Sequence, residues 1–160
     1  MKTIYLLRHA KANAGLNDLE RDLSTKGRRQ AEFIGQWMRE SGIMPDRIVS
    51  SPAKRTTVTA RLCAEQAGYQ GKIRFADDLY DAHSNTYIDL IAGLNNKHDS
   101  VMVVGHNPEI SAVVTVLTGE PLTMPPGTLV CIEMTTDQWV AAKDGNASLK
   151  WVHNMGTSMI

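Results

Sequence analysis

Residues 101–117 read VMVVGHNPEISAVVTVL, and this stretch indicates the fold class. Val101 to Val104 form a short, uninterrupted apolar run, which is typical of a strand buried on both faces of a parallel sheet. Asn107 and Pro108 then fit the N-cap and the first residue of a helix. Beyond them, apolar residues recur at helical spacing, namely Ile110, Val113, Val114 and Leu117. The stretch therefore predicts a buried strand that is followed at once by a helix with one apolar face.

The same alternation of strand and helix extends along the whole chain. Further strands are predicted at residues 3–7, 47–49, 72–75, 129–134 and 149–152, the last two joined by a turn at 144–146. Further helices are predicted from Ser24 or Thr25 to Gly42, from an N-cap at Ser51 to Gly68, and over about 84–94. No linker or internal repeat interrupts the series. We expect one α/β domain over residues 1–160, with a mainly parallel central sheet covered by helices on both faces.

Composition narrows the function classes. The chain has 160 residues with 17 basic and 17 acidic side chains, so its net charge does not predict binding to nucleic acid. Its apolar runs are too short for a signal peptide or a membrane span. Cys63 and Cys131 stand alone, which indicates core thiols in a reducing, cytoplasmic location.

Basic residues follow three of the predicted strands. Arg8 and His9 end the first strand, Arg55 lies in the first helical turn after the second, and His106 follows the strand at 101–104. Parallel strands place their carboxyl ends at one edge of a sheet, where helix N-termini attract anions. We therefore expect an anion-binding site at this edge.

Arg55 is the most informative of these residues, because a cation in the first turn opposes the helix dipole by about 0.3–1 kcal/mol. Its spacing with Val58 and Leu62 directs it toward the covered face. Each residue has an ordinary alternative when it is taken singly. Arg55 would be a surface arginine and Arg8 a charge that ends a strand. His9 and His106 would be hydrogen-bonded histidines in loops. The common position of all four favours binding.

Motifs for metals and nucleotides are absent from the sequence. It contains no His-Glu-x-x-His pair, no Cys-rich ligand spacing, no Walker loop and no Gly-x-Gly-x-x-Gly loop. We expect neither a metal nor a cofactor.

The three motifs together resemble the histidine phosphatase superfamily, with its phosphoglycerate mutase-like fold. They are Leu7-Arg8-His9-Ala10, Ser51-Pro52-Ala53-Lys54-Arg55-Thr56 and Val104-Gly105-His106-Asn107-Pro108. The segment Arg21-Asp22-Leu23-Ser24 is similar to the family's approach to its first helix. Within the superfamily the chain most resembles the short SixA-type phosphohistidine phosphatases.

The resemblance implies a role for each site residue. His9 would be the nucleophile, Arg8 and Arg55 would bind the phosphoryl group, and His106 would donate a hydrogen bond to it. Arg21 and Asn107 are further substrate-binding candidates. Ala10 replaces the family's usual glycine. Asp81 is the positional candidate for the general acid, and a solvated loop aspartate is its equally weighted alternative.

The resemblance implies a phosphatase, and the missing metal motifs predict that it is metal-independent. Since little chain remains for a lid above the site, we expect an open, shallow site that suits phosphate on another protein, and hence a phosphohistidine-bearing protein as the substrate. A small-molecule phosphomonoesterase is the alternative within the same chemistry. A non-catalytic phosphate-binding module is the alternative from another class. The physiological substrate and the oligomeric state are not predicted by the sequence.

Overall fold

The computed structural model describes residues 1–156 and 158–159. The strands are β1 (Lys2–Arg8), β2 (Arg47–Ser50), β3 (Arg74–Phe75), β4 (Ser100–Gly105), β5 (Leu129–Met134), β6 (Ser148–His153) and β7 (Ser158–Met159). The α-helices are α1 (Thr25–Glu40), α2 (Lys54–Ala67), α3 (Ser84–Ala92) and α4 (Glu109–Thr118). Short 3-10 helices are η1 (Asp18–Glu20), η2 (Asp77–Leu79) and η3 (Trp139–Asp144).

All the described strands belong to one sheet, in the order β3, β2, β4, β1, β5, β6 and β7. The first four of these strands run parallel to one another, and β5, β6 and β7 add antiparallel pairs on the other side of β1. The parallel half confirms the strand and crossover-helix units expected from the sequence. Strands β1 and β4 pair in register from Thr3 with Ser100 to Arg8 with Gly105, so they end side by side.

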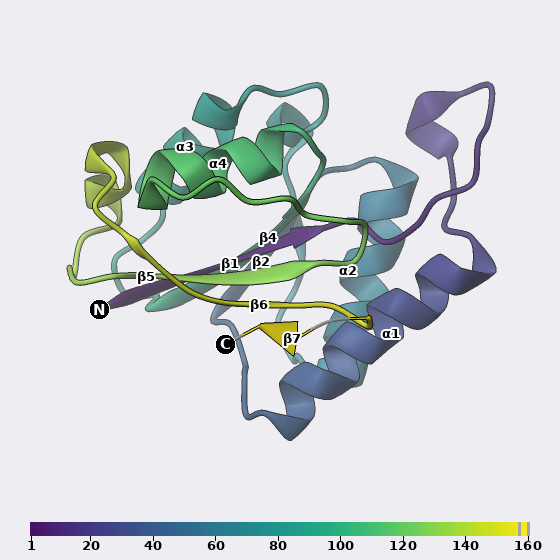
Figure 1. Ribbon diagram of the computed structural model, residues 1–160, viewed down its shortest axis with the longest axis horizontal. Coiled ribbons are helices and arrows are strands. Elements are labelled where there is room, and N and C mark those ends of the chain that lie inside the picture. Colours follow the sequence, from purple (N-terminus) through teal and green to yellow (C-terminus); the bar gives the residue numbers. More distant parts are fainter. Residues whose placement is uncertain (157, 160) are drawn as a thin grey trace.

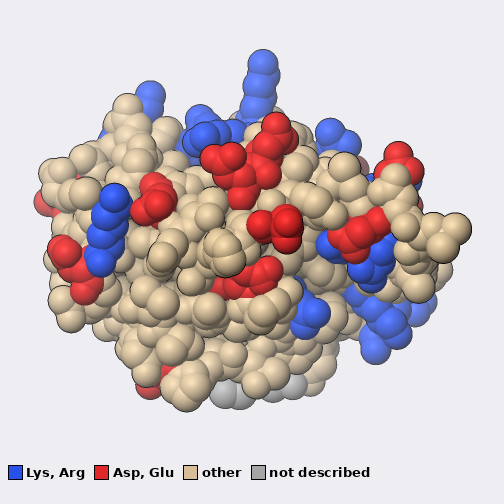
Figure 2. Space-filling model, turned by 90° about the horizontal axis from the view of Figure 1, so that it is seen from above, with Lys and Arg blue, Asp and Glu red and all other residues tan. Residues whose placement is uncertain are grey.

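Helices cover both faces of the sheet, as predicted (Figure 1). Ile4 and Leu6 of β1 point to the face that packs against α3 and α4, whereas Leu7 points to the face that packs against α1 and α2. This division follows from the alternation of side chains along a strand. On the α3 and α4 side, acidic and basic side chains are interspersed (Figure 2). No described helix is both long and apolar enough to span a membrane.

Two helix starts differ from the prediction. The N-cap of α2 is Ala53, and Ser51 is instead within 2.7 Å of the His106 ring nitrogen Nε2 through its Oγ. The N-cap of α4 is Pro108, because the Asn107 side chain is engaged elsewhere. The Asn107 amide donates to the carbonyl of Met124 at 3.1 Å and accepts from the Ser111 hydroxyl at 2.6 Å. In both cases a polar side chain that was predicted to cap a helix instead forms hydrogen bonds within the loops near the site.

The remaining elements follow the prediction closely. Ser24 caps α1, with its Oγ accepting from the backbone N–H of Gly27 at 3.0 Å. The predicted third strand is shortened to Arg74–Phe75. The turn between the closing strands is present at Gly145 and Asn146, which both have positive φ, but η3 precedes it.

Candidate active site

Two histidines lie side by side where β1 and β4 end. The backbone N–H of His9 donates to the carbonyl of Gly105 at 3.0 Å, and the rings of His9 and His106 have centroids 5.5 Å apart. Gly105 leaves room here, since a Cβ at this position would collide with the Tyr87 ring. The parallel register thus brings together two residues that are far apart in the sequence, as the strand-end argument predicted.

The His9 ring is held in one tautomer. Its Nδ1 lies 2.7 Å from the backbone carbonyl oxygen of Ala10, and a carbonyl only accepts, so Nδ1 carries the proton. The N–H of Ala10 is in turn held by Thr59 Oγ1 at 3.0 Å. No described residue is hydrogen-bonded to Nε2, and the His9 side chain lines the pocket.

Burial keeps the His9 ring neutral. Loss of hydration is the main cause that lowers its pKa to about 4, and the charges of Arg55, Arg8 and Arg21 act in the same direction. The hydrogen bond to Ala10 opposes them only in part. A neutral imidazole at ordinary pH has a free electron pair, which is what a nucleophile needs.

His106 is also buried and neutral. Its pKa is lowered to about 3, first by burial and then by Arg55. Its Nε2 is bonded to Ser51 Oγ, and its backbone N–H donates to Tyr87 Oη at 3.1 Å. Ser51 therefore holds the ring and Tyr87 holds the backbone, and Nδ1 is the ring nitrogen that no described residue engages.

Arg8 and Arg55 reach the same pocket from different elements. Arg55, only 7% exposed, confirms the expected lean toward the covered face of α2. Its two terminal nitrogens donate to Asp18, at 2.7 Å to the backbone oxygen and 3.1 Å to the carboxylate. Arg8 donates through Nη1 to the carbonyl of Met124 at 2.8 Å, while its Nε is buried with no partner among the described residues.

Asp18, which was not predicted from the sequence, accepts hydrogen bonds from several residues on this side of the site. Besides Arg55, its carboxylate accepts from Arg21 Nη1 at 3.1 Å and from the Tyr80 hydroxyl at 2.7 Å. These donors, Tyr80 first, hold the pKa of Asp18 well below its usual range. The same bond raises the pKa of Tyr80. Asp18 is 37 and 62 residues from Arg55 and Tyr80, so no local sequence pattern could have found it.

The pocket that these groups line has a volume of about 320 Å³. Every predicted site residue borders it, including Arg21, Asp81 and Asn107. Asp81 is exposed and has φ +54°, and no described residue is hydrogen-bonded to its carboxylate. Glu109, also missed, lines the pocket with its Oε2 buried and without a partner in the described part of the chain.

The pocket offers hydrogen-bond donors for an oxyanion. Three guanidinium groups and two neutral histidines line it, together with the carboxylates of Asp18, Asp81 and Glu109, and the space is large enough for a phosphoryl group. Among residues 1–156 and 158–159, no group of three or more His, Cys, Asp or Glu side chains could hold a metal. The thiols of Cys63 and Cys131 are buried elsewhere, as predicted, and burial raises the pKa of each to about 12.

Comparison with known proteins points to the same chemistry. The model of the histidine phosphatase superfamily (branch 1) matches residues 4–88. The uncharacterized protein Rv1276c of Mycobacterium tuberculosis is 34% identical over 113 residues, covering 69% of each chain. A solved structure from Nakamurella multipartitia covers 96% of both chains at 26% identity, with a TM-score of 0.83. Another, from Agrobacterium tumefaciens, covers 82% of this chain and 91% of that one at 34% identity, with a TM-score of 0.77. Both structures are assigned to the SixA phosphohistidine phosphatases.

Proposed function

Because the chain belongs to the histidine phosphatase superfamily, we propose that it is a phosphohistidine protein phosphatase that works through a covalent intermediate on His9. The observation that carries this proposal is the bond between His9 Nδ1 and the Ala10 carbonyl. It leaves Nε2 unprotonated on a ring that lines the same pocket as Arg8, Arg55 and His106. A nucleophile and its anion-binding groups therefore share one pocket.

The first step transfers the phosphoryl group. The Nε2 lone pair attacks phosphorus, an N–P bond forms, and the bond to the substrate nitrogen breaks. Its electron pair returns to the substrate ring, which leaves as neutral imidazole because its other nitrogen carries a proton. Arg8 and Arg55 bind the equatorial oxygens, over which charge is spread in a loose transition state. The Ser51 hydroxyl donates a hydrogen bond to His106 Nε2 in this step, so His106 Nδ1 carries the ring proton and donates a hydrogen bond to the same oxygens.

The second step releases phosphate. Water attacks phosphorus, the N–P bond breaks, and its electrons return to His9 Nε2, which restores the neutral ring. Both protons of the water stay on the released phosphate, which leaves as H₂PO₄⁻. Ala10 holds the Nδ1 proton throughout, so the same nitrogen is free for the next turnover. The arginines supply the positive charge that Mg²⁺ supplies in other phosphoryl-transfer enzymes, so the proposal needs no metal.

Support for a phosphohistidine substrate comes from the leaving group. Imidazole, with a conjugate-acid pKa near 6.5, needs little protonation to depart, whereas an alkoxide needs a positioned acid. Asp81, the positional candidate for that acid, is exposed, and no described residue forms a hydrogen bond that would fix its carboxylate. The SixA assignments of two similar structures point in the same direction. A small-molecule phosphomonoesterase is the second candidate, favoured by the carboxylates of Asp81 and Glu109 that line the pocket.

Rapid quenching with labelled substrate tests the mechanism. Wild-type protein should carry acid-labile, base-stable phosphate on His9, and His9→Ala should lose both the label and turnover. His83→Ala, which changes an exposed histidine outside the pocket, is the control and should behave as wild type. Label on another residue, or normal turnover of His9→Ala, would refute the covalent role.

A substrate panel tests the specificity. It compares a phosphohistidine protein, a phosphoserine peptide and small sugar phosphates, each with and without EDTA. Fast hydrolysis of phosphohistidine alone, unaffected by EDTA, is expected. Efficient hydrolysis of a sugar phosphate with phosphohistidine left intact would favour the second candidate, and loss of activity that added metal restores would overturn metal independence.

A further inference from the structure

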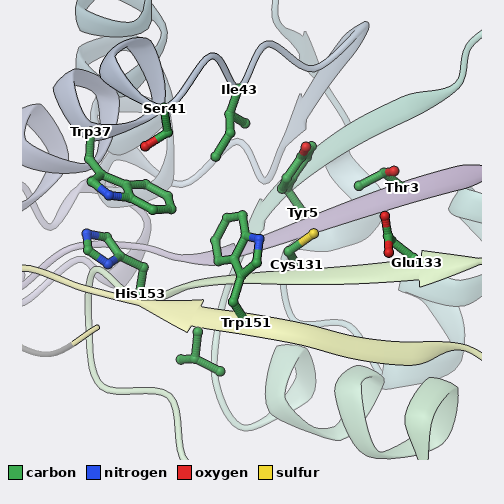
Figure 3. A pocket seen from close by; sticks show the side chains of 10 residues that line it. Thr3, Tyr5, Trp37, Ser41, Ile43, Cys131, Glu133, Trp151 and His153 are labelled. Carbon is green, nitrogen blue, oxygen red and sulfur yellow. The ribbon is translucent and has the colours of Figure 1, made fainter. Parts of the chain in front are cut away.

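A second pocket of about 330 Å³ lies at the other end of β1. Thr3 and Tyr5 of this strand line it, whereas Arg8 at the end of the strand and His9 just after it line the catalytic pocket. Side chains of β5 and β6 form its floor, and Trp37, Ser41 and Ile43, from α1 and the segment after it, border it (Figure 3). We call it the aromatic pocket.

Its residues converge because of the sheet register. Thr3 is opposite Glu133, Tyr5 is opposite Cys131, and Cys131 is opposite Trp151. Alternate residues of paired strands share one face, so these side chains stand together on the α1 side of the sheet. Three antiparallel neighbours thus present aromatic rings and one carboxylate to the same space.

The aromatic walls are partly exposed and held in place. Trp151 packs against Trp37 with ring centroids 5.0 Å apart at 79°, and against Tyr5 at 6.1 Å. Trp37 also stacks on the buried ring of His153 at 3.8 Å, and His153 stacks on Phe33 at 5.5 Å. Because the rings support one another, a ligand would meet faces that are already ordered, which reduces the entropy lost on binding.

Glu133 supplies the charge in this pocket. Burial raises the pKa of Tyr5 and of Cys131 to about 12, so both stay neutral, and burial lowers the pKa of His153. Lys150 lies 3.3 Å from the Glu133 carboxylate, but its side chain is 48% exposed and does not line the pocket. Such a surface ion pair is weak, so another cation can replace it.

We propose that the aromatic pocket binds a small organic cation, with an ammonium group at Glu133 and an apolar body against Trp151, Tyr5 and Trp37. Two independent features select this class. Aromatic faces attract cations through their quadrupole, and the carboxylate attracts them through its charge. An anion would be repelled by both, and a neutral apolar ligand would gain nothing from Glu133.

Tryptophan fluorescence provides the test. Trp37 and Trp151 are two of the three tryptophans in the chain, and both line the pocket. Trp139, the third, is fully buried in the core on the α3 and α4 side of the sheet. The protein is titrated with benzyltrimethylammonium and, in parallel, with benzyl alcohol, which keeps the ring without the charge. Both titrations contain vanadate, so that an oxyanion occupies the catalytic pocket. Saturable quenching by the cation is expected, with benzyl alcohol binding more weakly.

Variants identify the groups responsible. Glu133→Gln should weaken cation binding by about two- to fivefold, and Trp151→Leu by at least as much. Glu120→Gln, which removes an exposed carboxylate outside the pocket, should bind as wild type. Equal binding of benzyl alcohol and the cation, no saturation by the cation, or wild-type affinity in Glu133→Gln would each overturn the proposal. Glu133→Gln keeps the size and shape of a partly exposed side chain, so this result stands even if Trp151→Leu fails to fold.

Discussion

At the scale of single residues, Arg55 shows how the site departs from what stability alone would favour. Its guanidinium is almost fully buried, opposes the dipole of α2, and lowers the pKa of both histidines. Its partner Asp18 is half-exposed, so their ion pair adds little to stability. We propose that Arg55 is buried at this position because it binds the phosphoryl group.

Arg55→Gln should therefore separate activity from stability. We expect turnover to fall by about 10²–10³-fold, the usual loss for one preorganised donor to a transition state. The free energy of unfolding should change by less than about 1 kcal/mol. Steady-state kinetics and denaturant unfolding measure the two effects. Lys54→Gln, a neighbouring exposed cation of the same helical turn, is the matched control and should change neither.

Asp81 gives the second prediction at this scale. It borders the pocket but is exposed, and nothing in the described chain fixes its carboxylate. Asp81→Asn should leave phosphohistidine hydrolysis within about twofold, because imidazole departs without a strong acid. If Asp81 were the general acid, alkyl phosphate turnover would fall by about 10²–10⁴-fold while p-nitrophenyl phosphate was spared. Comparison of the three substrates decides between the roles.

At the scale of elements, the segment between β1 and α1 closes one side of the pocket. Its η1 turn brings Asp18 to Arg55, Arg21 and Tyr80, so that a carboxylate occupies donors that an oxyanion could use. Asp18→Asn should bind vanadate more tightly, by up to about fivefold, because one repulsive charge is removed. Asp22→Asn is the control, as Asp22 pairs with Arg28 and Lys54 outside the pocket. Weaker vanadate binding in Asp18→Asn would show that Asp18 mainly positions Arg55.

The strands and helices also show how much of the fold and of the site could be predicted from the sequence. Apolar periodicity was sufficient for β1, β4, α1 and α4, and the strand ends then located His9, Arg55 and His106 together. Two helix starts were wrong, because Ser51 and Asn107 look like caps but bond to residues that are distant in the sequence. Asp18 joins the site through tertiary contacts alone, which leave no spacing in the sequence that a periodicity argument could detect. Glu109 and Tyr80 were missed although each adjoins a predicted site residue, because Glu109 follows the His106 motif directly and Tyr80 is next to Asp81.

At the scale of the whole molecule, the neutral histidines couple the site to stability. In the unfolded chain a histidine has a pKa near 6.5, whereas the folded values are about 4 for His9 and about 3 for His106. As pH falls below 6.5, the unfolded chain takes up protons that the folded protein cannot accept. The free energy of unfolding is thus fully retained above pH 6.5 and declines as pH falls toward the folded values.

Denaturant unfolding between pH 7.5 and pH 5 measures this loss. Each such histidine should contribute a slope that approaches about 1.4 kcal/mol per pH unit below its unfolded pKa. The lowered pKa of His153 adds to the slope in the same direction, so a variant is needed to isolate the site. His106→Asn removes one titrating group. The free energy of unfolding of this variant should fall less steeply with acid than that of the wild type, and the difference in slope should correspond to about one proton. This comparison holds whatever the stability of the variant at pH 7.5. In this range most carboxylates stay ionised in both states, which keeps the comparison specific to histidine. Equal slopes for wild type and variant would mean that His106 takes up its proton at the same pH in the folded and unfolded chains. That result would contradict the buried, neutral pair of histidines from which the proposed mechanism starts.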